Sequence, residues 1–223
     1  MVESNKKRNN KSVAEAERLA AMLAFDSTHG EYRHICGVDE AGAGPLAGPV
    51  CGAAVVMPAG LSIEGINDSK KLSEKKRRLL YAEILENALT YCIVFVDNKE
   101  IDEINILQAR FKAMRLAVAG LSLQPDFVLV DGNVNPLDMP SAAITKGDSK
   151  SFSIACASIL AKVARDELML EYHAKYPEYG FDRHKGYGTK AHIEAIGIYG
   201  LTEIHRRSFL RGGSRLKPTE VSD

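Results

Sequence analysis

The sequence predicts an α/β domain with a mixed sheet, and two observations support this prediction. Short segments rich in β-branched residues, such as TYCIVFVD (90–97) and DFVLVD (126–131), alternate with longer segments of helical periodicity. The chain has 223 residues, 45% of them hydrophobic and 26% charged, which suits one folded domain with appendages. We find no internal repeat and no second block of apolar composition that would indicate another domain.

The N-terminal part of the chain is predicted to be less compact than the rest. Its first eleven residues are polar and rich in Lys and Asn, so we expect disorder there. A helix is expected over residues 12–26, with Ser12 as the N-cap and Glu15 completing a capping box. We expect this helix to pack on the domain, with binding of a partner as the alternative. The expected division is a disordered N-terminus (1–11), a helical extension (12–30), a folded domain (31–211) and a flexible tail (212–223).

The remaining elements follow from the spacing of apolar residues. Two strands, 34–40 and 50–57, are expected on either side of a glycine-rich loop. A helix is expected from Ser73 to Ala88, because Leu and Ile recur on one face while Lys and Arg occupy the other. The later elements are strand 90–97, helix 103–121, strand 126–131, a strand within 141–148, helix 151–175, a loop over 176–188 and helix 190–200.

Charge and cysteine usage restrict the class of protein. The formal net charge is zero, so any surface that binds nucleic acid must be a local basic patch. The four cysteines show no C-x-x-C spacing, which favours reduced thiols over a zinc site or a disulfide framework. The N-terminus does not resemble a signal peptide, and no apolar stretch approaches the roughly 18 residues that span a bilayer. We therefore expect a soluble, cytoplasmic protein.

The most informative stretch is GVDEAGAGPLAGPV (37–50), in which two adjacent acids precede a glycine-rich loop. Neighbouring strand residues point to opposite faces, so Asp39 and Glu40 would reach one site only if the pleat relaxes at the strand end. Asp131 ends a short apolar strand and Asp148 precedes a helix, positions at which ligand sites form in α/β sheets. Four converging carboxylates remain ionised only with cations among them, and oxygen ligands favour Mg²⁺ or Mn²⁺.

Each of these acids also has a plainer interpretation. Asp39 and Glu40 could be solvated residues of a turn. Asp131 could be a turn former before a glycine, and Asp148 a helix cap. Taken as a set, the four acids favour a divalent-metal site that acts on phosphate esters.

A second group of residues is basic or aromatic. Lys70 lies in a loop before a helix whose first turns hold residues 75–77, and such a loop suits phosphate binding, although 75–77 could be a solvated helix face. Tyr187 stands between two glycines, either as an exposed ring that stacks on a sugar or base, or as a half-buried packing residue. The expected substrate-binding set is Gly42, Ala43, Gly44, Lys70, His184, Lys185, Tyr187, Arg206 and Arg207.

In this order along the chain, the motifs resemble ribonuclease HII, the type 2 ribonuclease H family. The matching segments are GVDEAGAGPLAGPV, NDSKKLSEKKR, IDEINILQA, VLVDGN, KGDSKSFSIACASILAKVARD, YGFDRHKGYGT and HRRSF. The resemblance implies a ribonuclease H-like fold, with a mixed five-stranded sheet flanked by helices and a helical C-terminal part. It also implies a catalytic and metal-binding tetrad at Asp39, Glu40, Asp131 and Asp148, a backbone-phosphate contact at Lys70 and a sugar contact at Tyr187.

The resemblance further implies an activity. Such enzymes hydrolyse the RNA strand of RNA–DNA hybrids and incise 5′ to ribonucleotides embedded in duplex DNA, leaving 5′-phosphate and 3′-hydroxyl ends. The implied mechanism uses two Mg²⁺ or Mn²⁺ ions. The expected partner is the nucleic acid, bound by a monomer that does not contact membranes. Two alternatives stay open: a non-catalytic or weakly active hybrid-binding protein, and a related metal-dependent nuclease that acts on DNA.

One position departs from the family pattern. Ala43 stands where the family usually carries Arg, within a Gly-Arg-Gly tripeptide that reads the ribose 2′-hydroxyl largely through its main chain. The flanking Gly42 and Gly44 remain, so the main-chain contact is expected to survive. Loss of the guanidinium removes one charge-assisted hydrogen bond, worth about 1.5–3 kcal/mol. We therefore expect weaker substrate binding or poorer selectivity at the RNA–DNA junction.

Overall fold

The computed structural model describes residues 2–29 and 31–210, with side chains from Val13 onward. A mixed five-stranded sheet with the order β3-β2-β1-β4-β5 forms its centre. The strands are β1 (Ile35–Ala41), β2 (Val50–Val56), β3 (Thr90–Val96), β4 (Phe127–Asp131) and β5 (Ser141–Ile144). Strand β1 runs antiparallel to β2 and parallel to β4, β2 runs antiparallel to β3, and β4 runs parallel to β5. The predicted mixed α/β sheet is confirmed.

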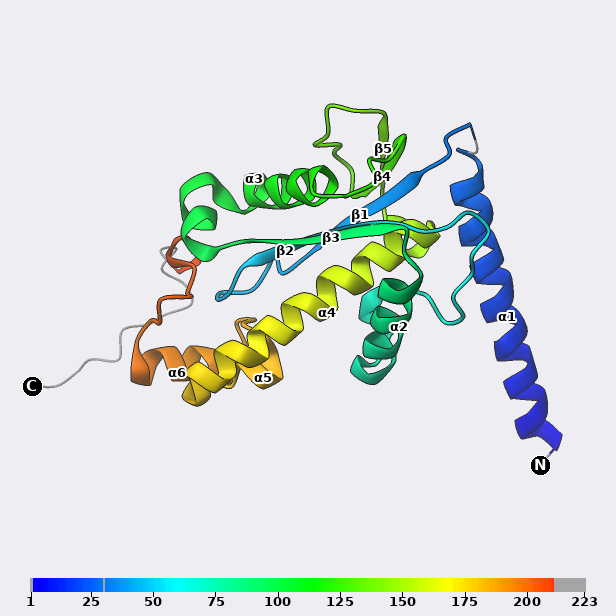
Figure 1. The fold of residues 1–223 in the computed structure, drawn as a ribbon. Helices are drawn as coiled ribbons and strands as arrows, with labels where there is room; N and C mark the ends of the chain where they lie inside the picture. Colours follow the sequence, from blue (N-terminus) through cyan, green and yellow to red (C-terminus); the bar gives the residue numbers. More distant parts are fainter. Residues whose placement is uncertain (1, 30, 211–223) are drawn as a thin grey trace, which may run out of the picture.

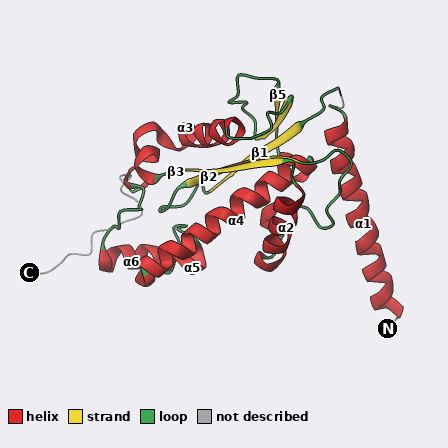
Figure 2. Cartoon of the chain, in the orientation of Figure 1, coloured by secondary structure: helices red, strands yellow, loops and turns green. Residues whose placement is uncertain are grey.

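Helices cover both faces of this sheet. In the part of the chain that the structure describes, they are α1 (Val2–Ser27), α2 (Glu74–Asn87), α3 (Asn98–Ala119), α4 (Phe152–Lys175), α5 (Phe181–His184) and α6 (Lys190–Tyr199). Helix α3 lies on one face of the sheet, while α4 crosses the other face with α2 packed against it (Figure 1). Helices α5 and α6 gather at the far end of α4 as a C-terminal helical part (Figure 2).

Two glycines let the helices approach the central strands closely. A Cβ atom added to Gly37 in β1 would lie 2.1 Å from the carbonyl carbon of Ser153 in α4. A Cβ atom added to Gly52 in β2 would lie 2.6 Å from the carbonyl oxygen of Ala113 in α3. A side chain at either position would therefore push a helix away from the sheet.

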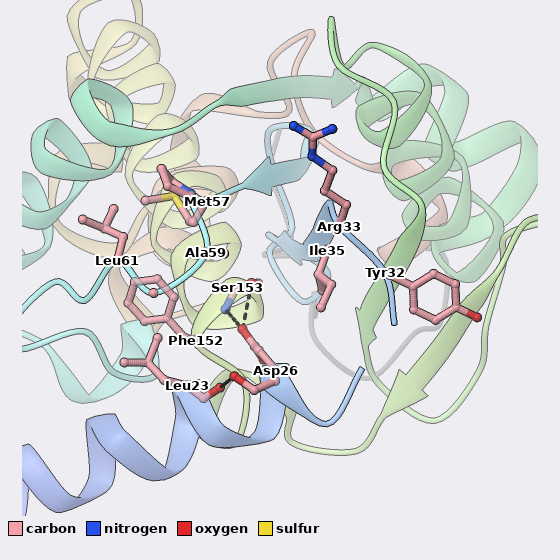
Figure 3. Close-up of a pocket in the computed structure, with 13 residues that line it drawn as sticks. Leu23, Asp26, Tyr32, Arg33, Ile35, Met57, Ala59, Leu61, Phe152 and Ser153 are labelled. Carbon is pink, nitrogen blue, oxygen red and sulfur yellow. Dashed lines mark hydrogen bonds between the residues drawn. The ribbon is translucent and has the colours of Figure 1, made fainter. Parts of the chain in front are cut away.

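Helix α1 packs on the domain through its C-terminal end. Met22 is 1% exposed and belongs to the hydrophobic core cluster on the α4 face of the sheet. Asp26 accepts hydrogen bonds of 2.8 Å from both the backbone N–H and the hydroxyl of Ser153, so α1 caps the N-terminus of α4. Figure 3 shows these bonds beside a pocket that is lined mostly by apolar side chains. The pocket has a volume of about 390 Å³. Packing of this helix on the domain, which we preferred to partner binding, is confirmed.

The start of α1 differs from the prediction. The helix begins at Val2 rather than at Ser12, ahead of the expected N-cap, while the disorder expected over residues 1–11 stays a prediction. No Gly or Pro interrupts residues 2–27, and a helix that is already nucleated by a packed segment extends at little cost. Residue 1 and the predicted flexible tail, 212–223, lie outside the described residues.

Three other boundaries also move. Helix α3 begins at Asn98 instead of residue 103, because the side chain of Asp97 accepts a hydrogen bond from the backbone of Glu100 and caps it. The backbone of Asn105, with φ of 65°, kinks the helix two residues after the start that we expected. Strand β5 stops at Ile144, and the expected loop over 176–188 contains a 3-10 turn and the short helix α5.

Two expectations about protein class are also addressed. The cysteines are free thiols, three of them buried, as the absence of paired spacing predicted. Within residues 2–29 and 31–210, none of the helices has both the length and the apolar character needed to cross a bilayer.

Candidate active site

Three of the predicted acids gather at the carboxyl ends of two parallel strands. Asp39 and Glu40 lie in β1, and Asp131 is the last residue of β4. Val38 of β1 pairs with Val130 of β4, so Asp39 and Asp131 follow at equivalent positions on neighbouring strands. Side chains at equivalent positions of paired parallel strands point to the same face. The two carboxylates are therefore neighbours at this edge of the sheet.

Asp148 joins this group through the loop that follows β5. One oxygen of Asp131, Oδ1, accepts hydrogen bonds from the backbone N–H of Gly147 at 2.7 Å and of Asp148 at 3.3 Å. Asp131 therefore fixes the 3-10 turn that carries Asp148. The alternative role of Asp148 as a cap of the following helix is filled by Ser151, which accepts a hydrogen bond from the backbone of Ile154.

Asp39 and Glu40 lie on opposite faces of β1. The strand keeps regular antiparallel pairing through Ala41, so the relaxation of the pleat that would bring both side chains to one face does not occur. Glu40 pairs with Gly52, the residue whose added Cβ would meet α3, and therefore lies on the α3 face. Asp39 lies on the α4 face, where the nearby hydroxyl of Ser158 opposes the rise of its pKa. The two carboxylates thus flank the end of one strand.

The acids nevertheless influence one another strongly. Burial, followed by the charges of Glu40 and Asp131, raises the pKa of Asp39 well above its ordinary value. Burial and the charge of Asp131 raise the pKa of Glu40 to about 7, although Arg110 opposes this shift. Burial, Asp68 and Asp131 raise the pKa of Asp148 as well. The cluster therefore holds more negative charge than its surroundings neutralise, and an added cation would stabilise it.

Arg110 of α3 is a nearby cation that we did not predict. Its Nη2 lies 2.6 Å from Oε1 of Glu40. The second oxygen of Glu40, Oε2, and Nε of Arg110 are both buried without a hydrogen-bond partner among the described residues. This half-satisfied pair leaves one buried carboxylate oxygen able to accept a cation. Helical spacing alone does not reveal which turn of α3 meets the end of β1.

Lys70 approaches the acids from the loop before α2. The side chain of Asp68 accepts a hydrogen bond of 2.9 Å from the backbone of Lys70 and caps the 3-10 turn Ser69–Lys71. The ammonium nitrogen of Lys70 lies 3.9 Å from Oδ2 of Asp148, and 80% of the side chain is exposed. This exposed cation beside the acids can reach a nucleic-acid phosphate.

Arg206 binds three backbone carbonyls of the glycine-rich loop, which comprises residues 42–49. Its guanidinium donates to the carbonyl oxygens of Gly42 at 2.6 Å, Ala43 at 2.9 Å and Gly48 at 2.9 Å. The residue is 0% exposed, and burial together with the charge of Arg165 lowers its pKa to about 9. Direct contact of Arg206 with a substrate, which we expected, is excluded by this burial, because the side chain faces the protein interior.

Arg165 of α4 binds two other backbone carbonyls of the same loop. It is 1% exposed and donates to the carbonyl oxygens of Ala47, Pro49 and Lys185 at 3.0–3.2 Å. A Cβ atom added to Gly42 would lie 2.0 Å from Nε of Arg165, so only glycine fits above the guanidinium. The sequence motif did not reveal this role, since Arg165 occurs in a predominantly apolar helix.

Tyr187 borders the glycine-rich loop on its solvent side. The tyrosine is 44% exposed, and a Cβ atom added to Gly44 would lie 3.6 Å from its ring. The ring is therefore neither fully buried nor isolated, and an open face remains for a sugar or base.

Two neutral histidines, His192 and His205, form a hydrogen-bonded chain that ends at the backbone carbonyl of Tyr187. The N–H of Thr202 donates to Nδ1 of His205, so Nε2 of His205 must carry the proton and donate to Nε2 of His192, 3.1 Å away. Nδ1 of His192 then donates to the carbonyl of Tyr187 at 2.9 Å. Burial, the largest cause, lowers the pKa of both histidines to about 4, which keeps this arrangement neutral.

The remaining basic residues of the expected substrate-binding set have different surroundings. His184 donates to the carbonyl of Tyr179 and accepts from the backbone of Gly186. Lys185 is 9% exposed and donates to the carbonyl of Asp182, so the expected contact of its ammonium with substrate is wrong for this conformation. Arg207 is exposed, which leaves it able to meet nucleic acid.

The acids do not form a complete metal-ligand set by themselves. Across residues 2–29 and 31–210, no group of three or more His, Cys, Asp or Glu side chains is arranged so that it could hold a metal ion. Three observations still fit a divalent cation. The donors are all oxygens, Oε2 of Glu40 is buried without a hydrogen-bond partner among the described residues, and burial together with the charges of neighbouring acids raises the pKa values of Asp39 and Glu40.

Comparisons with known proteins agree on one family. The family model described as Ribonuclease HII matches residues 36–212. The ribonuclease HII of Caldicellulosiruptor saccharolyticus is 59% identical over 181 residues, covering 81% of this chain and 88% of the relative. That of Ruminiclostridium cellulolyticum is 55% identical over 205 residues, covering 91% of this chain and 80% of the relative. The crystal structure of ribonuclease H2 from Pyrococcus horikoshii OT3 superimposes with a TM-score of 0.67 at 30% identity, covering 78% of this chain and 93% of that one. The chain therefore belongs to the ribonuclease HII family of endoribonucleases.

Proposed function

We propose that this endoribonuclease hydrolyses the RNA strand of RNA–DNA hybrids and incises 5′ to ribonucleotides embedded in duplex DNA. The observation that carries this proposal is the gathering of four acids at one edge of the sheet, between Lys70 and the glycine-rich loop. Family membership supports a substrate that contains RNA. The 2′-hydroxyl is the group that distinguishes a ribonucleotide from its deoxy counterpart at the cut position.

The residues that would hold Mg²⁺ or Mn²⁺ are Asp39, Glu40, Asp131 and Asp148. When bound, such ions supply a water of lowered pKa as nucleophile and stabilise the charge of the departing 3′ oxygen. We assign no covalent nucleophile to the chain. Its own contribution is to keep these acids close together despite their repulsion, with Asp131 fixed by the Gly147 and Asp148 amides.

The remaining residues would position the nucleic acid. Lys70 is exposed beside Asp148, where its ammonium can donate to a backbone phosphate. Tyr187 presents an open ring face beside Gly44, which suits stacking on the sugar next to the scissile bond. Arg207 adds an exposed cation. Because the net charge of the chain is zero, we expect binding to depend on this local patch and to weaken as salt is added.

One assay tests the proposal. A DNA duplex with a single internal ribonucleotide is incubated with the protein and Mg²⁺, Mn²⁺ or EDTA, and the ends are mapped. We expect nicking 5′ to the ribonucleotide with either metal and none with EDTA. Binding without nicking would favour a non-catalytic hybrid-binding protein, to which Ala43 lends some weight. Cleavage of an all-DNA duplex would favour a nuclease with a different substrate.

A further inference from the structure

Peptide geometry turns two amides of the glycine-rich loop away from the protein interior. In a trans peptide, the C=O of one residue and the N–H of the next point in opposite directions. Arg206 binds the carbonyls of Gly42 and Ala43 from within the protein, so the N–H groups of Ala43 and Gly44 point away from it. Neither amide donates to a protein acceptor among the described residues.

The carbonyls bound by Arg165 have a different consequence. Ala47 precedes Gly48, whose N–H donates to the carbonyl of Ile204 at 2.9 Å. Lys185 precedes Gly186, whose N–H donates to the ring of His184. The carbonyls of Ala47 and Lys185, bound by Arg165, are therefore followed by amides that donate within the protein. Two of the carbonyls bound by Arg206 are followed by amides without such an acceptor.

The unpaired amides lie where a nucleic acid would approach. Gly44 is exposed, Ala43 is half-buried, and the ring of Tyr187 lies against Gly44. Two adjacent N–H groups that point outward from one turn can bind an oxygen acceptor. Such acceptors are present on ribose hydroxyls and on phosphates.

We propose that Arg206 is a positioning residue for substrate recognition. By holding the carbonyls of Gly42 and Ala43, it directs the amides of Ala43 and Gly44 toward a sugar or phosphate oxygen of the ribonucleotide strand. Recognition at this turn then depends on the main chain and on a buried arginine, not on the side chain at position 43. This inference rests on the proposed function, because it requires a nucleic acid at the loop.

A matched pair of conservative variants, Arg206→Lys and Arg165→Lys, tests the inference. Each keeps a buried positive charge but removes the planar guanidinium that binds several carbonyls at once. Affinities for a ribonucleotide-containing duplex and an all-DNA duplex are measured in EDTA, so that cleavage does not interfere. We expect Arg206→Lys to weaken binding of the ribonucleotide duplex about fivefold to tenfold, as for one or two lost hydrogen bonds, and Arg165→Lys to change it less than about twofold.

The two duplexes distinguish the oxygen acceptors. A loss of affinity confined to the ribonucleotide duplex indicates a hydroxyl acceptor. An equal loss of affinity for both duplexes indicates a phosphate acceptor. Either result supports the inference. Unchanged affinity in a folded Arg206→Lys protein, or equal losses in both variants, would overturn it. Absence of duplex binding by the unmodified protein would instead count against the proposed function.

Two further readouts separate positioning from general destabilisation. In metal-dependent cleavage, Arg206→Lys should raise KM while kcat and the affinity for Mn²⁺ stay within about twofold, and a fall in kcat alone would contradict the inference. If the lysine variant does not fold, replacing Ala43 by lactic acid removes its N–H through a backbone ester and leaves Arg206 in place. That protein should show a similar loss of duplex affinity, and unchanged affinity would refute the role of this amide.

Discussion

Two groups of like charges lie near the carboxyl end of β1, and the protein treats them differently. The buried cations, Arg165 and Arg206, donate six hydrogen bonds to backbone carbonyls. Among the acids, burial and the charge of Asp131 raise the pKa of Glu40 to about 7, and its Oε2 has no hydrogen-bond partner among the described residues. Buried charges that are fully hydrogen-bonded serve the architecture, whereas buried charges left unsatisfied indicate where a ligand is expected.

The variant with the largest expected effect on this contrast is Asp39→Asn. The amide has nearly the same shape but loses the charge that would bind a metal ion, so turnover should fall at least about 1,000-fold, or about 4 kcal/mol. Stability in EDTA should be unchanged or higher, since the substitution relieves repulsion in the cluster. Single-turnover cleavage and urea unfolding measure the two effects.

A matched control for this variant is Asp138→Asn, which changes an exposed acid outside the cluster. It should leave both cleavage and stability as they are. Full activity of Asp39→Asn would remove Asp39 from the catalytic assignment, whatever the fold.

The second test follows stability with pH in the absence of metal. Because the folded-state pKa of Glu40 is raised from 4.5 to about 7, its stabilising contribution is complete below pH 4.5 and is lost as the pH rises through 7. The free energy of unfolding of the unmodified protein, minus that of Glu40→Gln, should fall by up to about 3 kcal/mol across this range. The buried neutral histidines make stability rise with pH in both proteins. This common contribution cancels when the two free energies are subtracted.

Addition of Mn²⁺ sharpens this measurement. Metal bound to the ionised acids should reduce the decline with pH in the unmodified protein, and should do so less in Glu40→Gln. A pH-independent difference between the two proteins in EDTA would show that Glu40 is not electrostatically strained.

The third test concerns the side chain at position 43. Ala43→Arg should raise affinity for the hybrid about tenfold, corresponding to one charge-assisted contact. It should also steepen the slope of log affinity against log salt concentration by about one unit. If recognition depends on the main chain, the preference for ribonucleotide over all-DNA duplex should stay the same. Titrations at several salt concentrations decide this, and unchanged affinity and cleavage efficiency would contradict the proposed phosphate contact.

The smallest expected effect comes from Arg110→Gln. Loss of the guanidinium beside Glu40 should lower metal-free stability by about 1 kcal/mol, because Glu40 loses its nearest counter-charge while the pair is partly exposed. Arg115→Gln removes an exposed charge from the same helix and serves as the control. Equal unfolding midpoints for the two variants in EDTA would show that the Glu40–Arg110 pair adds nothing to stability.

Local sequence patterns predicted the strands, most of the helices and the acids at the strand ends. These features depend on spacings of two to four residues and on turn chemistry, both visible along the chain. The opposite faces of Asp39 and Glu40 followed from the alternation of a regular strand, since the pleat does not relax at the end of β1. Residue 98 as the start of α3 was also available from the Asp97 cap.

Other features required the tertiary arrangement. Whether an arginine points outward or inward depends on which carbonyls surround it, so Arg206 was wrongly expected to contact substrate. The partnership of Arg110 with Glu40 depends on how α3 is placed on β1, which no local pattern specifies. Sequence reasoning thus identified the kinds of residue present but not the directions of their side chains.

The contact between α1 and α4 has a consequence for synthesis of the chain. Asp26 accepts hydrogen bonds from Ser153, which lies 127 residues later in the chain. A ribosome adding about 5–20 residues per second needs several seconds or more to make that stretch. Until then Met22 lacks the α4 part of its core cluster, so α1 cannot reach its final packing before residue 153 has been translated.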